Sequence, residues 1–221
     1  MRGPHDETTP LPRHIEAELA CWAAARELRP GHREAVYVSQ PITSGQTFVD
    51  WLAERGSRLE PGSPERDESF RAGVMLPNLQ RAAGLVETLR WREGCAVIDP
   101  SSLDVPAFEQ NEYHRFWVAV LERFVRRVVF LNGWEHSNGC CIEYRTAAEL
   151  GLECVDETFG DLPLELGIAR IEAALDETRR RDLELDTSAR REVLAALRAL
   201  ASESAEARVG AVGLRGLYKD T

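Results

Sequence analysis

A glutamate that follows a glycine-containing loop is the residue of this sequence best placed to do chemistry. In residues 127–143, four consecutive apolar residues precede a loop with two glycines and then a helical pattern that contains Glu143. The apolar run is typical of a strand buried on both faces. We expect Asn138 or Gly139 to cap the helix, which places Glu143 within about its first turn. The positive end of the helix dipole then keeps this carboxylate ionised, as a nucleophile must be.

The same position also has a purely structural interpretation. Acidic residues are common in the first turn of a helix because they interact favourably with its dipole, whatever the protein does. The choice between the two interpretations depends on the polar residues that the rest of the fold places near Glu143.

The elements that must position this glutamate follow a regular alternation of strands and helices. The predicted strands are residues 35–39, 95–100, 128–131 and 152–156. Alternation of this kind predicts an α/β fold, with a parallel sheet covered by helices on both faces. Parallel sheets bind ligands at the carboxyl ends of their strands. The residues at these ends are polar: Ser39 and Gln40, Asp99, Asn132 and Asp156. We therefore expect a ligand site at this edge; the plain alternative is that the strand ends merely meet solvent.

Helical spacing predicts the remaining elements and the domain organisation. The expected helices are residues 13–28, 46–55, 78–91, 109–124, one after Gly139, and two amphipathic helices around 164–175 and 193–200. Residues 59–64 are expected to form a loop, and the tail after Ala205 is expected to be loose. The long connection between the first two strands suggests a flap over the site. The division is an N-terminal helical extension (1–34), an α/β domain (35–160), and C-terminal helices with a tail (161–221).

Composition excludes several classes of function. The chain has 221 residues and a formal net charge of −10, which argues against a nucleic-acid polymer as partner. It contains no run long and apolar enough for a membrane span and no apolar segment near its start, so we expect a cytoplasmic protein without membrane contact. Its five cysteines and five histidines show no metal-ligand spacing. Because dinucleotide and P-loop fingerprints are also absent, we expect neither a metal nor a cofactor.

Two separated motifs carry a resemblance to a known superfamily. Residues 36–45 read Val-Tyr-Val-Ser-Gln-Pro-Ile-Thr-Ser-Gly, and residues 130–143 read Phe-Leu-Asn-Gly-Trp-Glu-His-Ser-Asn-Gly-Cys-Cys-Ile-Glu. In this order and context they resemble the nucleoside 2-deoxyribosyltransferase-like superfamily, in particular an uncharacterised branch of it. The resemblance covers about residues 35–156. It implies a flavodoxin-like parallel sheet, cleavage or transfer at the N-glycosidic bond of a nucleoside or nucleotide, and a homo-oligomer.

The resemblance also implies roles for individual residues. Glu143 takes the place of the nucleophile at the anomeric carbon, where a carboxylate can trap the oxocarbenium-like centre left by a departing base. The loop before it resembles the stretch that holds the sugar or its 5′-phosphate. The complete set of candidate binding residues is Tyr37, Ser39, Gln40, Asp99, Asn132, Ser137, Asn138 and Gly139.

One departure from the superfamily pattern keeps other functions open. Members usually carry an aspartate on the helix before the glutamate-bearing loop, where it helps to protonate or position the base. This chain has Ala119 near that spacing, and Glu112, His114 or Asp99 are the alternatives. A non-catalytic nucleotide-sensing module is therefore the competing hypothesis. Cleavage of the nicotinamide bond of NAD is a third, because it uses the same glutamate chemistry.

Overall fold

The computed structural model describes residues 10–103, 105 and 108–216, and its centre is a four-stranded parallel sheet. The strands are β1 (Ala35–Ser39), β2 (Val97–Ile98), β3 (Val125–Phe130) and β4 (Glu153–Asp156), in the order β2-β1-β3-β4. All pairs are parallel. Because the strands alternate with helices that cover both faces, the predicted flavodoxin-like α/β fold is confirmed.

Helices make up most of the remaining chain. They are α1 (Arg13–Ala24), α2 (Gln46–Glu54), α3 (Pro64–Phe70), α4 (Leu76–Glu93), α5 (Gln110–Phe124), α6 (Asn138–Glu149), α7 (Leu164–Arg180) and α8 (Ser188–Gly216). Four shorter turns are η1 (Gly56–Arg58), η2 (Arg71–Met75), η3 (Pro100–Ser102) and η4 (Trp134–His136). The η2 segment is a π-helix that joins α3 to α4.

The two faces of the sheet pack against different helices. Along β1, Val36 and Val38 belong to the cluster that packs against α4. Tyr37, between them, belongs to the larger cluster with residues of α5 and α6. This follows from the period of two residues in a strand, which sends alternate side chains to opposite faces. All five residues of β1 are buried, so this strand is the centre of the core.

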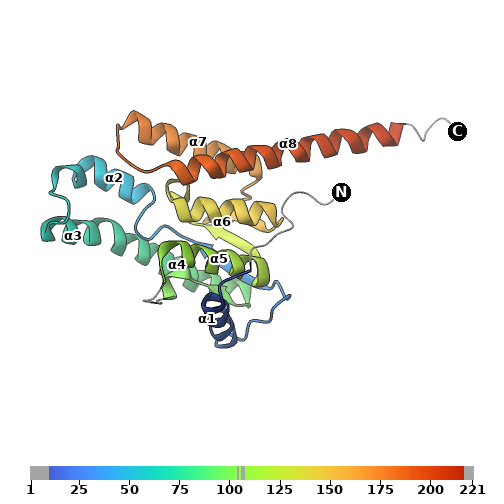
Figure 1. Ribbon diagram of the computed structural model, residues 1–221, viewed down its shortest axis with the longest axis horizontal. Helices are drawn as coiled ribbons and strands as arrows, with labels where there is room; N and C mark the ends of the chain where they lie inside the picture. The colour runs from blue at the N-terminus through green and yellow to red at the C-terminus, as the bar shows by residue number, and fades with distance from the viewer. Residues whose placement is uncertain (1–9, 104, 106–107, 217–221) are drawn as a thin grey trace.

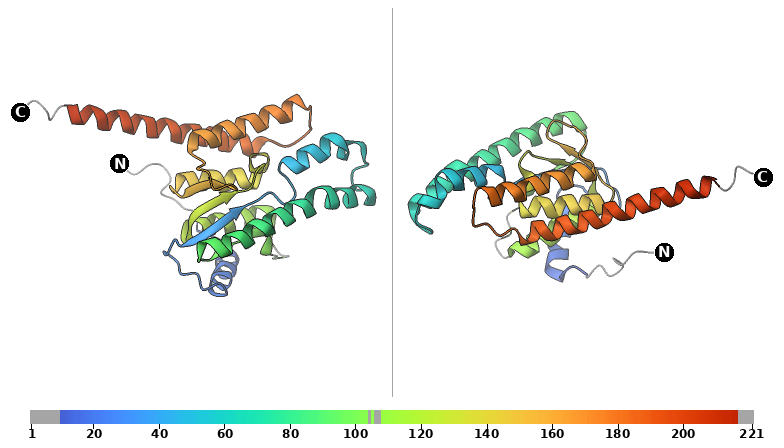
Figure 2. Two further views of the ribbon diagram at one scale, coloured as in Figure 1. Left: turned by 180° about the vertical axis from the view of Figure 1, so that it is seen from behind. Right: turned by 90° about the horizontal axis from the view of Figure 1, so that it is seen from above.

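The terminal helices form outer layers on the α5 and α6 side. In Figures 1 and 2, α7 and α8 lie over α6, and α8 continues past the body of the molecule towards the C-terminus. Helix α1 packs on α5, where the Trp22 ring meets those of Phe116 and Trp117 edge to face. The amphipathic C-terminal helices thus find their packing surface within the same chain.

Several element boundaries differ from the predicted ones. Helix α1 ends at Ala24 rather than at residue 28, because the chain turns through a left-handed residue at Glu27 (φ 56°). Strand β2 has only two residues. Pro100 has no backbone N–H to donate to a neighbouring strand, and the Ser101 N–H donates to the Asp99 side chain rather than to a strand. The predicted loose tail after Ala205 is wrong as far as Gly216, where α8 ends, and residues 217–221 lie outside the described residues.

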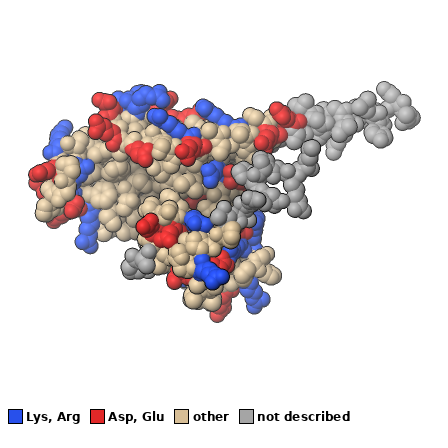
Figure 3. Space-filling view, in the orientation of Figure 1, with Lys and Arg blue, Asp and Glu red and all other residues tan. Residues whose placement is uncertain are grey.

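Two observations concern the nucleic-acid-binding and membrane-spanning classes that the composition argues against. Figure 3 shows basic and acidic side chains interspersed over the described part of one face. None of the helices in the described ranges is both long and apolar enough to cross a membrane.

Candidate functional site

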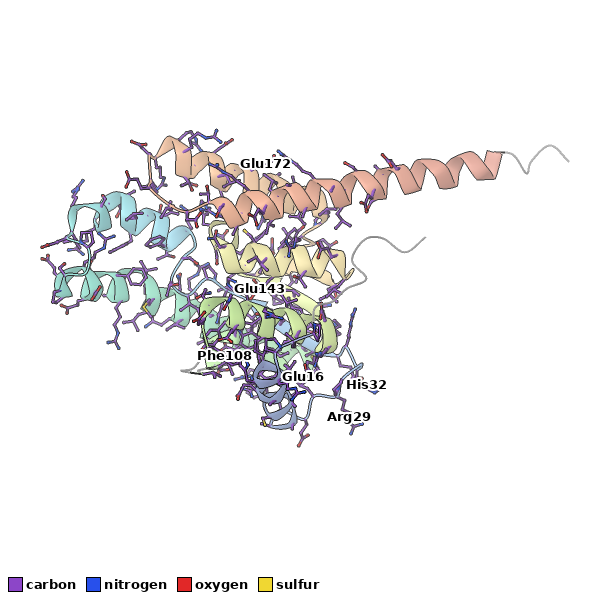
Figure 4. The ribbon with its side chains drawn as sticks, in the orientation of Figure 1. Glu16, Arg29, His32, Phe108, Glu143 and Glu172 are labelled. Carbon is purple, nitrogen blue, oxygen red and sulfur yellow. The ribbon has the colours of Figure 1, made fainter. Side chains whose placement is uncertain are left out.

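Glu143 lies on the side of α6 that faces the sheet, and Figure 4 shows it between α6 and α5. The helix is capped by Ser137, whose Oγ accepts the Cys140 N–H at 3.4 Å. The expectation that Asn138 or Gly139 would be the cap is therefore wrong. Because Asn138 is the first helical residue, Glu143 is in the second turn and not the first.

Two hydroxyl groups of β1 hold the Glu143 carboxylate. The Tyr37 hydroxyl donates to Oε1 at 2.6 Å, and the Ser39 hydroxyl donates to Oε2 at 2.6 Å. Tyr37 and Ser39 are two residues apart, so they leave the same face of the strand and reach the same helix. Both are completely buried, which fixes the carboxylate in one position.

Burial raises the pKa of Glu143 from its ordinary value of 4.5 to about 7, although the hydrogen bonds from Ser39 and Tyr37 act in the opposite direction. The prediction of a fully ionised carboxylate is therefore wrong. Desolvation disfavours the charged form more than the helix dipole favours it in the second turn. Burial and the nearby Glu143 also raise the pKa of Tyr37 well above its ordinary value, so its hydroxyl stays protonated and can donate.

The raised pKa predicts a pH-dependent cost in stability. The folded protein holds a proton on Glu143 between its ordinary pKa of 4.5 and about 7, whereas the unfolded chain releases it, so wild-type stability falls as pH rises through this range. Glu143→Gln does not titrate. We expect it to raise the free energy of unfolding by about 2–3 kcal/mol at about pH 8, and by less than about 1 kcal/mol at about pH 5. Urea denaturation at both pH values measures the difference; an equal effect at both would contradict it.

A cavity of about 550 Å³ opens beside the Glu143 carboxylate. This volume is within the range of small-molecule sites. The end of β1, the segment before α2, η3, helix α5, the start of α6 and the start of α8 all contribute to it. Polar and aromatic side chains both line it, as they do in many small-molecule sites.

Five of the predicted residues line this cavity: Gln40, Ser137, Asn138, Gly139 and Glu143. Gln40 Nε2 donates to Asp99 Oδ1 at 2.8 Å, which leaves Gln40 Oε1 buried without a partner among the described residues. A ligand N–H is the kind of group that would satisfy this acceptor.

The other predicted residues lie outside the cavity wall. Tyr37 and Ser39 stand behind Glu143, and Asp99 stands behind Gln40, so these three support wall residues. Asn132 is exposed, and its backbone N–H donates to Glu157 at 3.3 Å. Strand β3 ends at Phe130, two residues before Asn132, and Asn132 does not line the cavity with the other predicted residues.

His114 is the only one of the three alternatives to the missing aspartate that lines the cavity. Glu112 instead accepts the Glu109 N–H at 2.8 Å and contacts His14 at 2.6 Å. Burial lowers the pKa of His114, so its imidazole is neutral near pH 7. Its Nε2 is 3.0 Å from Gln110 Nε2. A neutral imidazole at this wall can hydrogen-bond a ligand through its N–H or its lone pair, but it is a poor proton donor.

Sequence reasoning missed several residues of the cavity wall. Trp117 was interpreted as core; it is 7% exposed and has both roles. Phe48 at the start of the long crossover, and Leu185 and Arg190 from the C-terminal segment, also line the cavity. Nothing local in the sequence marks Leu185 or Arg190, because their position depends on how α8 packs against α6. No group of three metal-ligating side chains that could hold an ion is found within the described ranges.

Comparison with known proteins gives one partial match. The family described as "Domain of unknown function (DUF4406)" matches residues 74–156. The matched part includes α5, β3 and Glu143, and excludes β1 and the C-terminal helices. No curated protein and no solved structure matches the chain.

Proposed function

We propose that this protein cleaves the N-glycosidic bond of a nucleoside or nucleotide, with Glu143 as the nucleophile. The observation that carries the proposal is the position of its carboxylate, which two buried hydroxyls of β1 hold at the wall of a cavity of about 550 Å³. The resemblance of residues 36–45 and 130–143 to the nucleoside 2-deoxyribosyltransferase-like superfamily supports the same chemistry.

The geometry suggests how the reaction would proceed. Each Glu143 oxygen accepts one hydrogen bond and keeps a further lone pair. One oxygen attacks the anomeric carbon while the base leaves with the bonding electrons and takes a proton from water. The resulting glycosyl ester is then attacked at the same carbon by water or by a second base, and the carboxylate is released.

Other wall residues suit a nucleobase. Trp117 and Phe48 offer aromatic surface, and Gln40 Oε1 offers an acceptor that has no partner within the described chain. Flat rings bind such surfaces by stacking, while a single amide fixes their orientation. These contacts would hold the base and leave the glycosidic bond beside Glu143.

The direct test is a panel of nucleosides, 5′-nucleotides and NAD, in ribose and deoxyribose forms, with chromatography of the released base. We expect base release by the wild-type protein and none by Glu143→Gln. Glu149→Gln is the matched control, because Glu149 is exposed on the same helix. Release that is equal in wild type and Glu143→Gln would remove the proposed role. Release of nicotinamide alone would identify NAD as the substrate.

The pH dependence gives a second prediction. Only ionised Glu143 is a nucleophile, so kcat/KM should rise with pH to a plateau, with a midpoint near the raised pKa of about 7. Ser39→Ala removes a hydrogen bond that lowers this pKa, so the midpoint should move to higher pH. A pH profile of kcat/KM for both proteins measures the shift, and an unchanged midpoint in Ser39→Ala would contradict it.

A non-catalytic nucleotide-binding module is the second candidate. It is favoured because few of the described residues of the cavity wall carry a carboxylate. Apart from Glu143 the wall has only Asp186, which accepts the Ser188 N–H at 2.9 Å and its hydroxyl at 2.7 Å at the start of α8. These hydrogen bonds lower the pKa of Asp186, so its carboxylate is ionised near neutral pH and cannot protonate a leaving base. Saturable nucleotide binding without base release would favour this candidate.

A further inference from the structure

Arg190 is a charged side chain buried at the cavity wall. Only 2% of its surface is exposed. Its Nε and Nη1 atoms have no hydrogen-bond partner among the residues that the structure describes. Burying a guanidinium without a paired anion is unfavourable, and native proteins rarely do so without a functional reason.

The surroundings of Arg190 make its position still less favourable for a cation. It is the third residue of α8, and it lines the same cavity as the start of α6. Its positive charge acts on both His136, the residue before the Ser137 cap, and Cys141, in the first turn of α6. The first turn of a helix carries partial positive charge, so Arg190 opposes the dipoles of two helices at once.

Other hydrogen-bond donors converge on this part of the cavity. Asn138 and Gly139 are the first two residues of α6, and their backbone N–H groups donate to no acceptor in the described chain. His136 is not one of these donors, because its Nε2 is 3.5 Å from Glu177 Oε2 and the Nδ1 of a neutral ring is then an acceptor. A buried cation, a helix N-terminus and unused donors together form a site for an anion.

We propose that Arg190 binds a phosphate ester of the substrate and so makes a nucleotide the preferred substrate over a nucleoside. The resemblance already implies a sugar or a 5′-phosphate at the loop before α6, and Arg190 is the buried cation that the structure adds to the same cavity. This inference rests on the proposed function for its substrate class. Gly139 and Glu143 are four residues apart, which is about 6 Å along a helix axis. A single sugar ring therefore connects a phosphate at the helix N-terminus with an anomeric carbon beside the Glu143 carboxylate.

The nearby acids do not replace such a ligand. Asp186 interacts with Arg190 at longer range, but no hydrogen bond joins them among the described residues, and Asp186 Oδ1 accepts the hydroxyl and N–H of Ser188. Arg190 also lies outside the residues that match the family of unknown function. The inference therefore depends on the packing of α8 in this chain.

The first experiment measures binding, so that it does not depend on turnover. Isothermal titration with a nucleoside, its 5′-monophosphate and inorganic phosphate compares the wild type with Arg190→Met, Arg190→Lys and the exposed control Arg191→Gln. We expect the wild type and Arg191→Gln to bind the monophosphate about 10- to 100-fold more tightly than the nucleoside, and Arg190→Met to lose this difference. Arg190→Lys should keep part of it. Equal affinities for the two ligands in the wild type, or an unchanged preference in Arg190→Met, would overturn the inference.

A thermal melt separates a ligand-binding role from a structural one. Removal of an unpaired buried charge should raise the melting temperature of Arg190→Met without ligand and abolish its increase on addition of phosphate. A lower melting temperature with the phosphate response retained would show a structural role and overturn the inference. Monophosphate binding through Arg190 without base release would leave the anion site standing and remove the proposed reaction. Base release without preference for the monophosphate would support the proposed reaction and overturn the anion site.

Discussion

Glu143→Gln is expected to lower the rate of base release by three or more orders of magnitude, because loss of a nucleophile removes the covalent step itself. The glutamine amide keeps the shape of the side chain and can still contact the two hydroxyls that hold it, from Tyr37 and Ser39. The nucleotide should therefore bind with similar affinity. The expected loss is in kcat rather than in KM, and single-turnover measurement of base release on the preferred nucleotide gives this value.

The control for this prediction uses the same helix. Glu149 is exposed and pairs with Arg145 at 3.5 Å, so Glu149→Gln changes the charge of α6 without touching the cavity. Its rate should remain within about twofold of the wild-type rate, as is usual for a surface substitution. If both variants lose activity to the same extent, the effect belongs to the helix as a whole, and Glu143 has no special role.

Gly167→Ala is expected to destabilise the protein by about 3 kcal/mol, at the upper end of the usual cost of overpacking a core. Gly167 lies in α7 directly against the Tyr144 ring, and an added Cβ would be 2.1 Å from the Cζ atom of that ring. The ring cannot move away easily. It packs against Trp134 and Phe130, and its hydroxyl donates to the Pro163 carbonyl at 2.9 Å.

Gly84→Ala provides the matched substitution. Gly84 lies within α4, where an added Cβ would meet nothing within 4 Å. Alanine should stabilise the protein there by up to about 1 kcal/mol, through better helix propensity. Urea denaturation of both variants measures the contrast. Similar effects of the two substitutions would show that α7 is not packed tightly on Tyr144.

Local patterns were sufficient to predict the alternation of strands and helices. Residues 35–38 of β1 are apolar because the strand is buried on both faces. The glycine-containing loop before α6 can likewise be recognised from the sequence alone. Glu143 was also found in this way. Its protonation state could not be predicted, because desolvation depends on how α6 packs over β1, which no local pattern encodes.

The missed residues have a common physical origin. Arg190 and Leu185 reach the cavity only because α7 and α8 fold back over α6. Asn132 was included because it ends a strand, but position at a sheet edge does not determine the direction in which a side chain leaves it. Long-range packing, rather than secondary structure, therefore accounts for the difference between the predicted and the observed site.

The order of the cavity-lining residues along the chain has a consequence for biosynthesis. They extend from Gln40, just after the first strand, to Arg190, in the last helix. A nascent chain that has emerged from the ribosome only as far as β4 contains every strand of the sheet but lacks one wall of the cavity. We therefore expect the complete cavity to form only after the start of α8 has been translated.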